Sequence, residues 1–305
     1  MPHRTVAGVL AGALLALTAA CGGSEPAASD AAAAEPSASV PTPSANAGIR
    51  AMLPKEIQDR GYLTNLVQSP NAPMEYTEAT GGPLIGVDLD LVQALGAVLG
   101  VQIKTSTVND FTQLLPAVQT KRTDIVMSAV KDLKERQASV SFVDYFMTGD
   151  QFLTLAKDAG SYKSVADLCG KTVVAANGTS YFSVIEKLSA EHCAGKQPIK
   201  SLGAVSAAEQ LIQVRQGRAV ANLTGLEPQA YQMKVEPGVW APTAGEPMHR
   251  VPYGVVFTKD NEQLGKAVQA GINELIKSGV YQRILDKWNL SAAAVTEAAV
   301  NGGGK

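Results

Sequence analysis

The stretch Gly86-Val87-Asp88-Leu89-Asp90-Leu91 opens the segment that decides the fold of this 305-residue chain. Apolar residues then recur at the spacing of one helix face, and the pattern stops at Gly100. The residues of this face are Leu91, Val92, Leu95, Val98 and Leu99. A short run typical of a strand follows at once, at residues 101–105. A helix that leads directly into a strand predicts an α/β fold with parallel strands.

The same alternation of short apolar runs and helical periodicity continues on both sides of this segment. Further strands are expected at residues 63–67, 125–127, 151–156, 172–176, 219–223 and 251–257, and near Ile199. Further helices are expected at residues 111–120, 164–168, 180–190, 206–216 and 264–276, with a last one that ends at Trp288. The stretch from Ile49 to Leu290 is long enough for one large domain or two lobes.

Residues 1–20 have the composition of an export signal peptide. His3 and Arg4 precede an apolar run, residues 6–20, that is too short to span a bilayer. This run ends in Leu17-Thr18-Ala19-Ala20-Cys21, which resembles a bacterial lipobox, where the cysteine thiol becomes lipidated. We expect Cys21 to anchor the protein as a lipoprotein on the outer face of the cell membrane. An ordinary secretory signal that contains a cysteine is the alternative.

Two segments contain few residues that a core can bury. Residues 22–48 consist largely of Ala, Ser, Pro and Glu, which predicts a disordered tether after the lipidated Cys21. Residues 291–305 are similarly rich in Ala and Gly, which predicts a flexible tail.

The remaining cysteines and the overall charge narrow the function classes. Cys169 and Cys193 are an even pair in an exported chain, which predicts a disulfide rather than two separate buried thiols. The net charge is −2 and there is no block of Lys and Arg, so no nucleic-acid partner is expected. His192 and His249 have no neighbours at metal-ligand spacing, so no metal site is expected. The chain has neither a Gly-x-Ser-x-Gly motif nor a P-loop, so we predict no cofactor and no enzyme activity.

Several short motifs occur in a fixed order along the chain. Besides residues 86–91 they are Leu114-Leu115-Pro116-Ala117, Asp124-Ile125-Val126-Met127-Ser128, Glu135-Arg136, Phe142-Val143-Asp144, Asp167-Leu168-Cys169-Gly170-Lys171, Gly178-Thr179-Ser180, Ser278-Gly279-Val280-Tyr281 and Lys287-Trp288. This ordered set spans residues 62–290 and resembles family 3 of the bacterial extracellular solute-binding proteins, the polar amino-acid group. Val87 departs from the pattern, because an aromatic or larger aliphatic residue is usual there.

The resemblance implies a type II periplasmic-binding-protein fold, in which two crossing strands join two α/β lobes. Lobe 1 would comprise residues 49–150 and 254–290, and lobe 2 residues 151–253, with the hinge near residues 152–155 and 254–257. The family likeness also implies a monomer that carries a small polar solute with a carboxylate, such as an amino acid or derivative. Its partners would be the permease subunits of an ABC importer, which it meets at the membrane through its lipid anchor.

The resemblance also identifies candidate ligand-binding residues. Arg136 would hold the carboxylate of the solute through two parallel hydrogen bonds, although it could instead be a surface arginine that pairs with Glu135 or Asp132. Gly178, Thr179 and Ser180 precede a helix, where backbone N–H groups and hydroxyls suit an anion or merely cap the helix. Two further candidates are Ser128, which ends its motif, and Phe111, which is either an apolar wall of the site or a core residue.

The departures from the family pattern concern charge. Gly225 stands where an aspartate usually binds the ammonium group, Gln68 where a second acid is usual, and Asn71 where an aromatic residue usually stacks. Lys131 replaces a small hydroxyl residue. These changes favour a negatively charged solute, unless Lys131 is neutralised by Asp132 or Asp144.

Glu227, two residues after Gly225, remains a possible source of the missing acid. A few proteins of this fold are cyclohexadienyl dehydratases, which need a general acid in the cleft. Glu227 is the one candidate for that role. A periplasmic enzyme of that kind is the alternative function.

Overall fold

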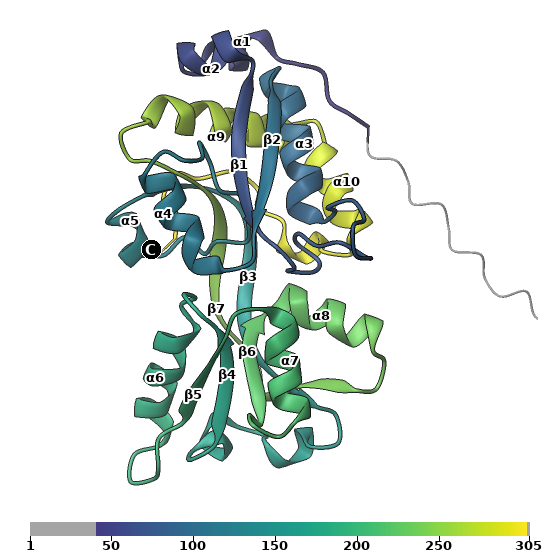
Figure 1. Cartoon of the computed structure of the whole chain (residues 1–305), viewed down its shortest axis with the longest axis vertical. Coiled ribbons are helices and arrows are strands. Elements are labelled where there is room, and N and C mark those ends of the chain that lie inside the picture. The colour runs from purple at the N-terminus through teal and green to yellow at the C-terminus, as the bar shows by residue number, and fades with distance from the viewer. Residues whose placement is uncertain (1–40, 304–305) are drawn as a thin grey trace, which may run out of the picture. The chain divides into compact units, whose positions relative to one another are not determined.

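The computed structural model of the protein describes residues 41–303 (Figure 1). Cys21, the signal peptide and most of the expected tether lie outside the described residues. The end of the tether is ordered, because Asn46 caps helix α1 (Ala47–Ala51) and its backbone N–H donates to the Val98 carbonyl. Among residues 41–303, no helix is both long enough and apolar enough to cross a membrane.

Lobe 1 is built around the segment that the sequence singled out. Helix α3 (Val87–Leu99) connects β1 (Tyr62–Gln68) to β2 (Gln102–Val108), and the two strands pair in parallel. The helix begins after Gly86, where only glycine fits, because a Cβ atom at that position would lie 2.0 Å from the Met74 carbonyl oxygen. Single bridges from Ile125 to β1 and from Val126 to β7 extend the sheet, so this predicted strand is present only as isolated bridges.

Helices cover lobe 1 and bury the apolar face of α3. Its other helices are α2 (Lys55–Arg60), α4 (Leu114–Gln119), α5 (Lys134–Gln137), α9 (Glu262–Lys277) and α10 (Val280–Lys287). The predicted face of α3, from Leu91 to Leu99, is buried in one core with residues of α9 and α10. This burial removes apolar surface from water and holds the helix on the sheet.

Lobe 2 is a five-stranded sheet in the order β5-β4-β6-β3-β7. Its own strands are β4 (Thr172–Ala176), β5 (Lys200–Ala204) and β6 (Ala221–Gly225), and its helices are α6 (Tyr181–His192), α7 (Ala207–Arg215) and α8 (Leu226–Val235). Strands β5, β4 and β6 are parallel, as the alternation of strands and helices predicted.

The predicted disulfide joins Cys169 and Cys193, with a Cα–Cα distance of 5.6 Å. It links the end of a short 3₁₀ helix (Val165–Leu168) to the residue that follows α6. A link across a loop of this length stabilises the fold by about 3 kcal/mol in the chain-entropy model.

Two long antiparallel strands, β3 (Ser141–Leu155) and β7 (Trp240–Phe257), run from one lobe into the other (Figure 1). Phe146 of β3 belongs to the core of lobe 1, whereas Phe152 belongs to the core of lobe 2. In β7 the same change occurs between Ala244 and Tyr253. The strands therefore cross earlier than the predicted segments, residues 152–155 and 254–257, which are buried inside the lobes.

The residues after Leu290 do not form the flexible tail that their composition predicts. Ala298 is fully buried in the core of lobe 1, and Val300 bridges to Val143 of β3. The Gly303 N–H donates to Asp132 over 2.8 Å. Gly303 approaches so closely that a Cβ atom would lie 1.9 Å from the Asp132 carbonyl oxygen. Packing at this point requires small residues. The Ala- and Gly-rich composition of the segment does not reveal this requirement.

Candidate functional site

A cleft of about 70 Å³ lies between the lobes, near the point where β3 and β7 cross. Lobe 1 contributes Gln68, Asn71, Met74, Phe111 and Ala129, and strand β7 contributes Tyr253. Lobe 2 contributes Ala176, Thr179, Tyr181, Val205, Ser206, Ala207, Gln210, Thr224 and Pro228. Four of the predicted site residues, Gln68, Asn71, Phe111 and Thr179, thus line one cavity.

Arg136 lies on α5 and reaches from lobe 1 to lobe 2. Its Nη1 donates to the Lys131 carbonyl over 3.0 Å and its Nη2 to the Gly178 carbonyl over 3.4 Å. The guanidinium carbon is 5.5 Å from the centre of the Phe111 ring, and burial lowers the pKa of Arg136. These hydrogen bonds go to backbone carbonyls rather than to Glu135 or Asp132. Because a guanidinium has five N–H donors, three remain for another group.

The loop before α6 forms the opposite wall. Gly178 has φ +74°, and a Cβ atom there would lie 2.6 Å from Thr112 Cγ2 of lobe 1, so a glycine lets the lobes approach. Thr179 Oγ1 donates to the Ala176 carbonyl over 2.7 Å. Ser180 is the N-cap residue of α6, and its side chain makes no capping hydrogen bond. The start of α6, with the positive end of its helix dipole, lies beside the cleft, which Thr179 and Tyr181 line.

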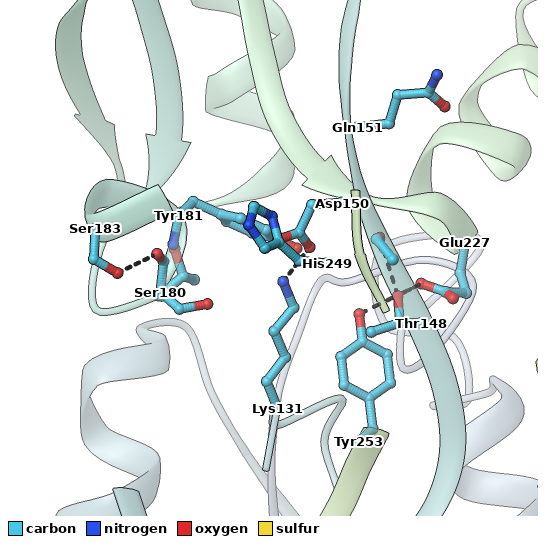
Figure 2. A network of polar contacts seen from close by, with 12 residues as sticks. Lys131, Thr148, Asp150, Gln151, Ser180, Tyr181, Ser183, Glu227, His249 and Tyr253 are labelled. Atoms are coloured by element: carbon cyan, nitrogen blue, oxygen red, sulfur yellow. Dashed lines mark hydrogen bonds and ion pairs between the residues drawn. The ribbon is translucent and has the colours of Figure 1, made fainter. Parts of the chain in front are cut away.

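Lys131 is buried, with 5% of its surface exposed, and forms an ion pair with Asp150 of β3 (Figure 2). Its Nζ is also 4.2 Å from the centre of the Tyr181 ring of lobe 2. Burial lowers the pKa of Lys131 and raises that of Asp150, and the pairing opposes both shifts. His249 Nδ1 lies 3.9 Å from the second Asp150 oxygen. The partner of Lys131 is thus Asp150, not Asp132 or Asp144.

Glu227 lies in the first turn of α8 and is only 3% exposed. Its Oε2 accepts hydrogen bonds from Thr148 Oγ1 at 2.8 Å and from the Tyr253 hydroxyl at 3.4 Å (Figure 2). Burial raises the pKa of Glu227 to about 7. A Cβ atom at Gly225 would lie 2.8 Å from the same oxygen. The Glu227 carboxyl group therefore fills the space in which a side chain at position 225 would begin.

Ser128 and Asn71 are tied to a buried acid that the sequence did not reveal. The Ser128 hydroxyl donates to Glu75 Oε1 over 2.8 Å, and Asn71 Nδ2 donates to the same oxygen over 2.9 Å. Burial, with the nearby Asp88 carboxyl, raises the pKa of Glu75 far above its usual value, while burial raises that of Asp88 to about 6. Ser128 thus bonds to a buried acid within lobe 1, next to Asn71, which lines the cleft.

Three further residues in or beside the cleft were not predicted from the sequence. Asp150 and Tyr253 lie within crossing strands, where their apolar neighbours conceal them. Gln210 had a readable signal, because it is a polar residue on the buried face of α7, one turn before Val214.

Residues 63–291 match the pattern of the bacterial extracellular solute-binding proteins, family 3, and the chain belongs to this family. Its solved neighbours have the type II periplasmic-binding-protein fold. The P235GK mutant of the arginine-binding protein ArgBP from T. maritima superposes with a TM-score of 0.68 at 26% identity, covering 77% of this chain and 98% of that one. The ancestral amino acid-binding protein AncCDT-1, a precursor of cyclohexadienyl dehydratase, gives 0.69 at 26% identity with the same coverage.

Among sequence relatives, the arginine-binding protein ArgT of Corynebacterium glutamicum is 29% identical over 255 residues, which cover 83% of this chain and 82% of that protein. The L-glutamate/L-aspartate-binding protein of Pseudomonas aeruginosa is 27% identical over 245 residues, covering 77% and 78%. The two names show that this level of similarity includes ligands with side chains of opposite charge.

Proposed function

We propose that this protein is a lipid-anchored, extracytoplasmic binding protein that delivers an amino acid or a related carboxylate-bearing solute to an ABC importer. The observation that carries this proposal is the position of Arg136, which lies between the lobes above Phe111 and opposite the start of α6. A planar guanidinium facing a helix N-terminus offers donors from two sides, which is an arrangement suited to a carboxylate.

A thermal-shift screen of amino acids, carboxylates and osmolytes tests the proposal. A ligand at 100 times its Kd adds about 2.7 kcal/mol to the free energy of unfolding. Arg136→Ala is expected to weaken binding of the hit at least tenfold, because a charge-assisted hydrogen bond contributes roughly 1.5–3 kcal/mol. Arg122→Ala is the matched control, since Arg122 is an exposed arginine of lobe 1. Equal affinities of the two variants would contradict the carboxylate clamp.

The anchor is tested separately from the binding site. Cys21→Ser is expected to release the protein from the membrane fraction into the medium, because the modified thiol would be lost. Retention on the membrane after normal cleavage of the signal peptide would contradict lipidation.

A second candidate is a cyclohexadienyl dehydratase-like enzyme. The buried Glu227 favours it, since a carboxyl group with a pKa of about 7 suits a general acid. The assay is formation of phenylpyruvate from prephenate, with Glu227→Gln as the inactive control. If no turnover is seen while a solute binds, the protein functions in binding alone.

A further inference from the structure

Two buried amide oxygens at the cleft have no hydrogen-bond partner among residues 41–303. They are Oε1 of Gln210, a residue that is 3% exposed, and Oδ1 of Asn222, which is 4% exposed. Buried polar groups in folded proteins are nearly always hydrogen-bonded, so each exception calls for an explanation. Both residues line a cavity, so a shift of their side chains would bring these oxygens to a ligand.

The two residues line neighbouring cavities between the lobes. Gln210 lines the cleft described above, and Asn222 lines a neighbouring cavity of about 170 Å³. The two cavities share Ala207, Thr224 and Pro228. The second cavity thus lies next to the cleft along α7, on the side of Asn222.

The walls of both cavities carry no Asp, Glu, Lys or Arg side chain within the described part of the chain. Their polar groups are the amides and hydroxyls of Gln68, Asn71, Thr179, Tyr181, Ser206, Gln210, Asn222, Thr224, Tyr231, Gln232 and Tyr253. A charged side chain would lose its hydration here without meeting an opposite charge, which is unfavourable. A carboxamide or ureido group loses less, because amide groups supply both a donor and an acceptor.

We infer that the solute is an amino acid with an uncharged, hydrogen-bonding side chain of the carboxamide or ureido type, and that Gln210 and Asn222 select it. This inference rests on the proposed function and specifies its substrate class. It also replaces the expectation of a negatively charged solute, because the cation on which that expectation depended, Lys131, is paired with Asp150.

Isothermal titration with seven probes tests the substrate class. The neutral probes are L-glutamine, L-asparagine and L-citrulline, and the charged ones are L-arginine, L-lysine, L-glutamate and L-aspartate. We expect one of the neutral probes to bind at least tenfold more tightly than any charged one. If a charged probe binds most tightly, the inference fails and the proposed function stands. If none of the seven binds, amino-acid binding fails, and the inference fails with it.

Variants of one helix test the role of Gln210. Gln210→Leu removes the amide at similar size, and we expect it to weaken binding of the best neutral probe about tenfold. Gln213→Leu is the matched control, because Gln213 is on the same helix and also has an unpartnered buried oxygen but lines neither cavity. Its affinity should equal that of the wild type.

Gln210→Glu provides a second readout if Gln210→Leu does not fold. This nearly isosteric change adds an acid to the neutral wall, so we expect the preference to shift at least tenfold towards L-arginine. Unchanged relative affinities in Gln210→Glu, or equal losses in Gln210→Leu and Gln213→Leu, would overturn the assignment.

Discussion

The cleft and the region beside it differ in how their polar groups are satisfied. Beside the cleft, near the crossing strands, charged side chains have partners within the protein, since Lys131 pairs with Asp150, and Glu227 accepts from Thr148 and Tyr253. Along α7, among the described residues, the cavity walls carry no charged side chain, yet Gln210 and Asn222 have oxygens without partners. A charged residue near a binding cleft is thus not necessarily available to a ligand. Unpaired groups are the better guide to specificity.

The largest effect is expected when Lys131 loses its partner Asp150. Asp150→Asn leaves the buried Lys131 without its counter-charge, which should destabilise the fold by about 3–5 kcal/mol. The double variant Lys131→Met, Asp150→Leu replaces the pair by apolar groups and should recover most of this loss. Urea unfolding measures both. If Asp150→Asn is as stable as the wild type, Asp150 does not offset the cost of burying Lys131.

Glu227 allows a test by pH. Its folded-state pKa is raised to about 7, so the native state binds the proton more tightly than the unfolded chain. The contribution of Glu227 to stability is therefore complete below about pH 4.5 and is lost as the pH rises through 7, a decrease on the order of 3 kcal/mol. Glu227→Gln should reduce this decrease, leaving the part with the same sign that comes from Glu75, Asp88 and Asp150, whose pKa values burial also raises.

Thermal unfolding between pH 5 and 8 measures this effect. Glu56→Gln, which changes an exposed glutamate of α2, is the control and should keep the pH profile of the wild type. A Glu227→Gln profile as steep as that of the wild type would mean that Glu227 does not hold the proton.

Arg136→Lys distinguishes charge from geometry at the clamp. Lysine keeps the positive charge but cannot make two parallel hydrogen bonds to one carboxylate. We expect affinity for the identified solute to lie between those of the wild type and Arg136→Ala, with a loss of about 1 kcal/mol. Calorimetric titration measures it. Full affinity in Arg136→Lys would reduce the clamp to a simple point charge.

Gly178→Ala tests the contact between the lobes. The new Cβ would lie 2.6 Å from Thr112 Cγ2, which should hinder closure and weaken binding several-fold, in addition to a backbone cost of about 1 kcal/mol at φ +74°. Gly195→Ala is a close control, because Gly195 has φ +76° and a Cβ atom there would have no other atom within 4 Å. Gly195→Ala should lower stability without changing affinity. If both variants bind equally, the approach at Gly178 does not matter for closure.

Several features were predictable because they depend on neighbours in sequence. The periodic apolar face after Gly86 predicted α3, and its burial against α9 and α10 agrees with that pattern. The ordered motifs predicted the family and the two-lobed fold, and the paired cysteines predicted the disulfide. The same motif order predicted Arg136 and the loop 178–180 on facing lobes. In the structure Arg136 Nη2 lies 3.4 Å from the Gly178 carbonyl oxygen.

Other features were decided only by the tertiary structure, because they join residues that no local pattern connects. Asp150 reaches Lys131 because β3 crosses between the lobes at that point. Residues 291–303 look like a loose Ala- and Gly-rich tail, yet Ala298 is buried in lobe 1 and Gly303 lies directly against the backbone at Asp132. Gln210 and Asn222 line neighbouring cavities although they belong to a helix and to the strand that follows it. Helical and strand periodicity arise from interactions between close residues, whereas charge pairing and unsatisfied polar groups depend on what the folded chain brings near them.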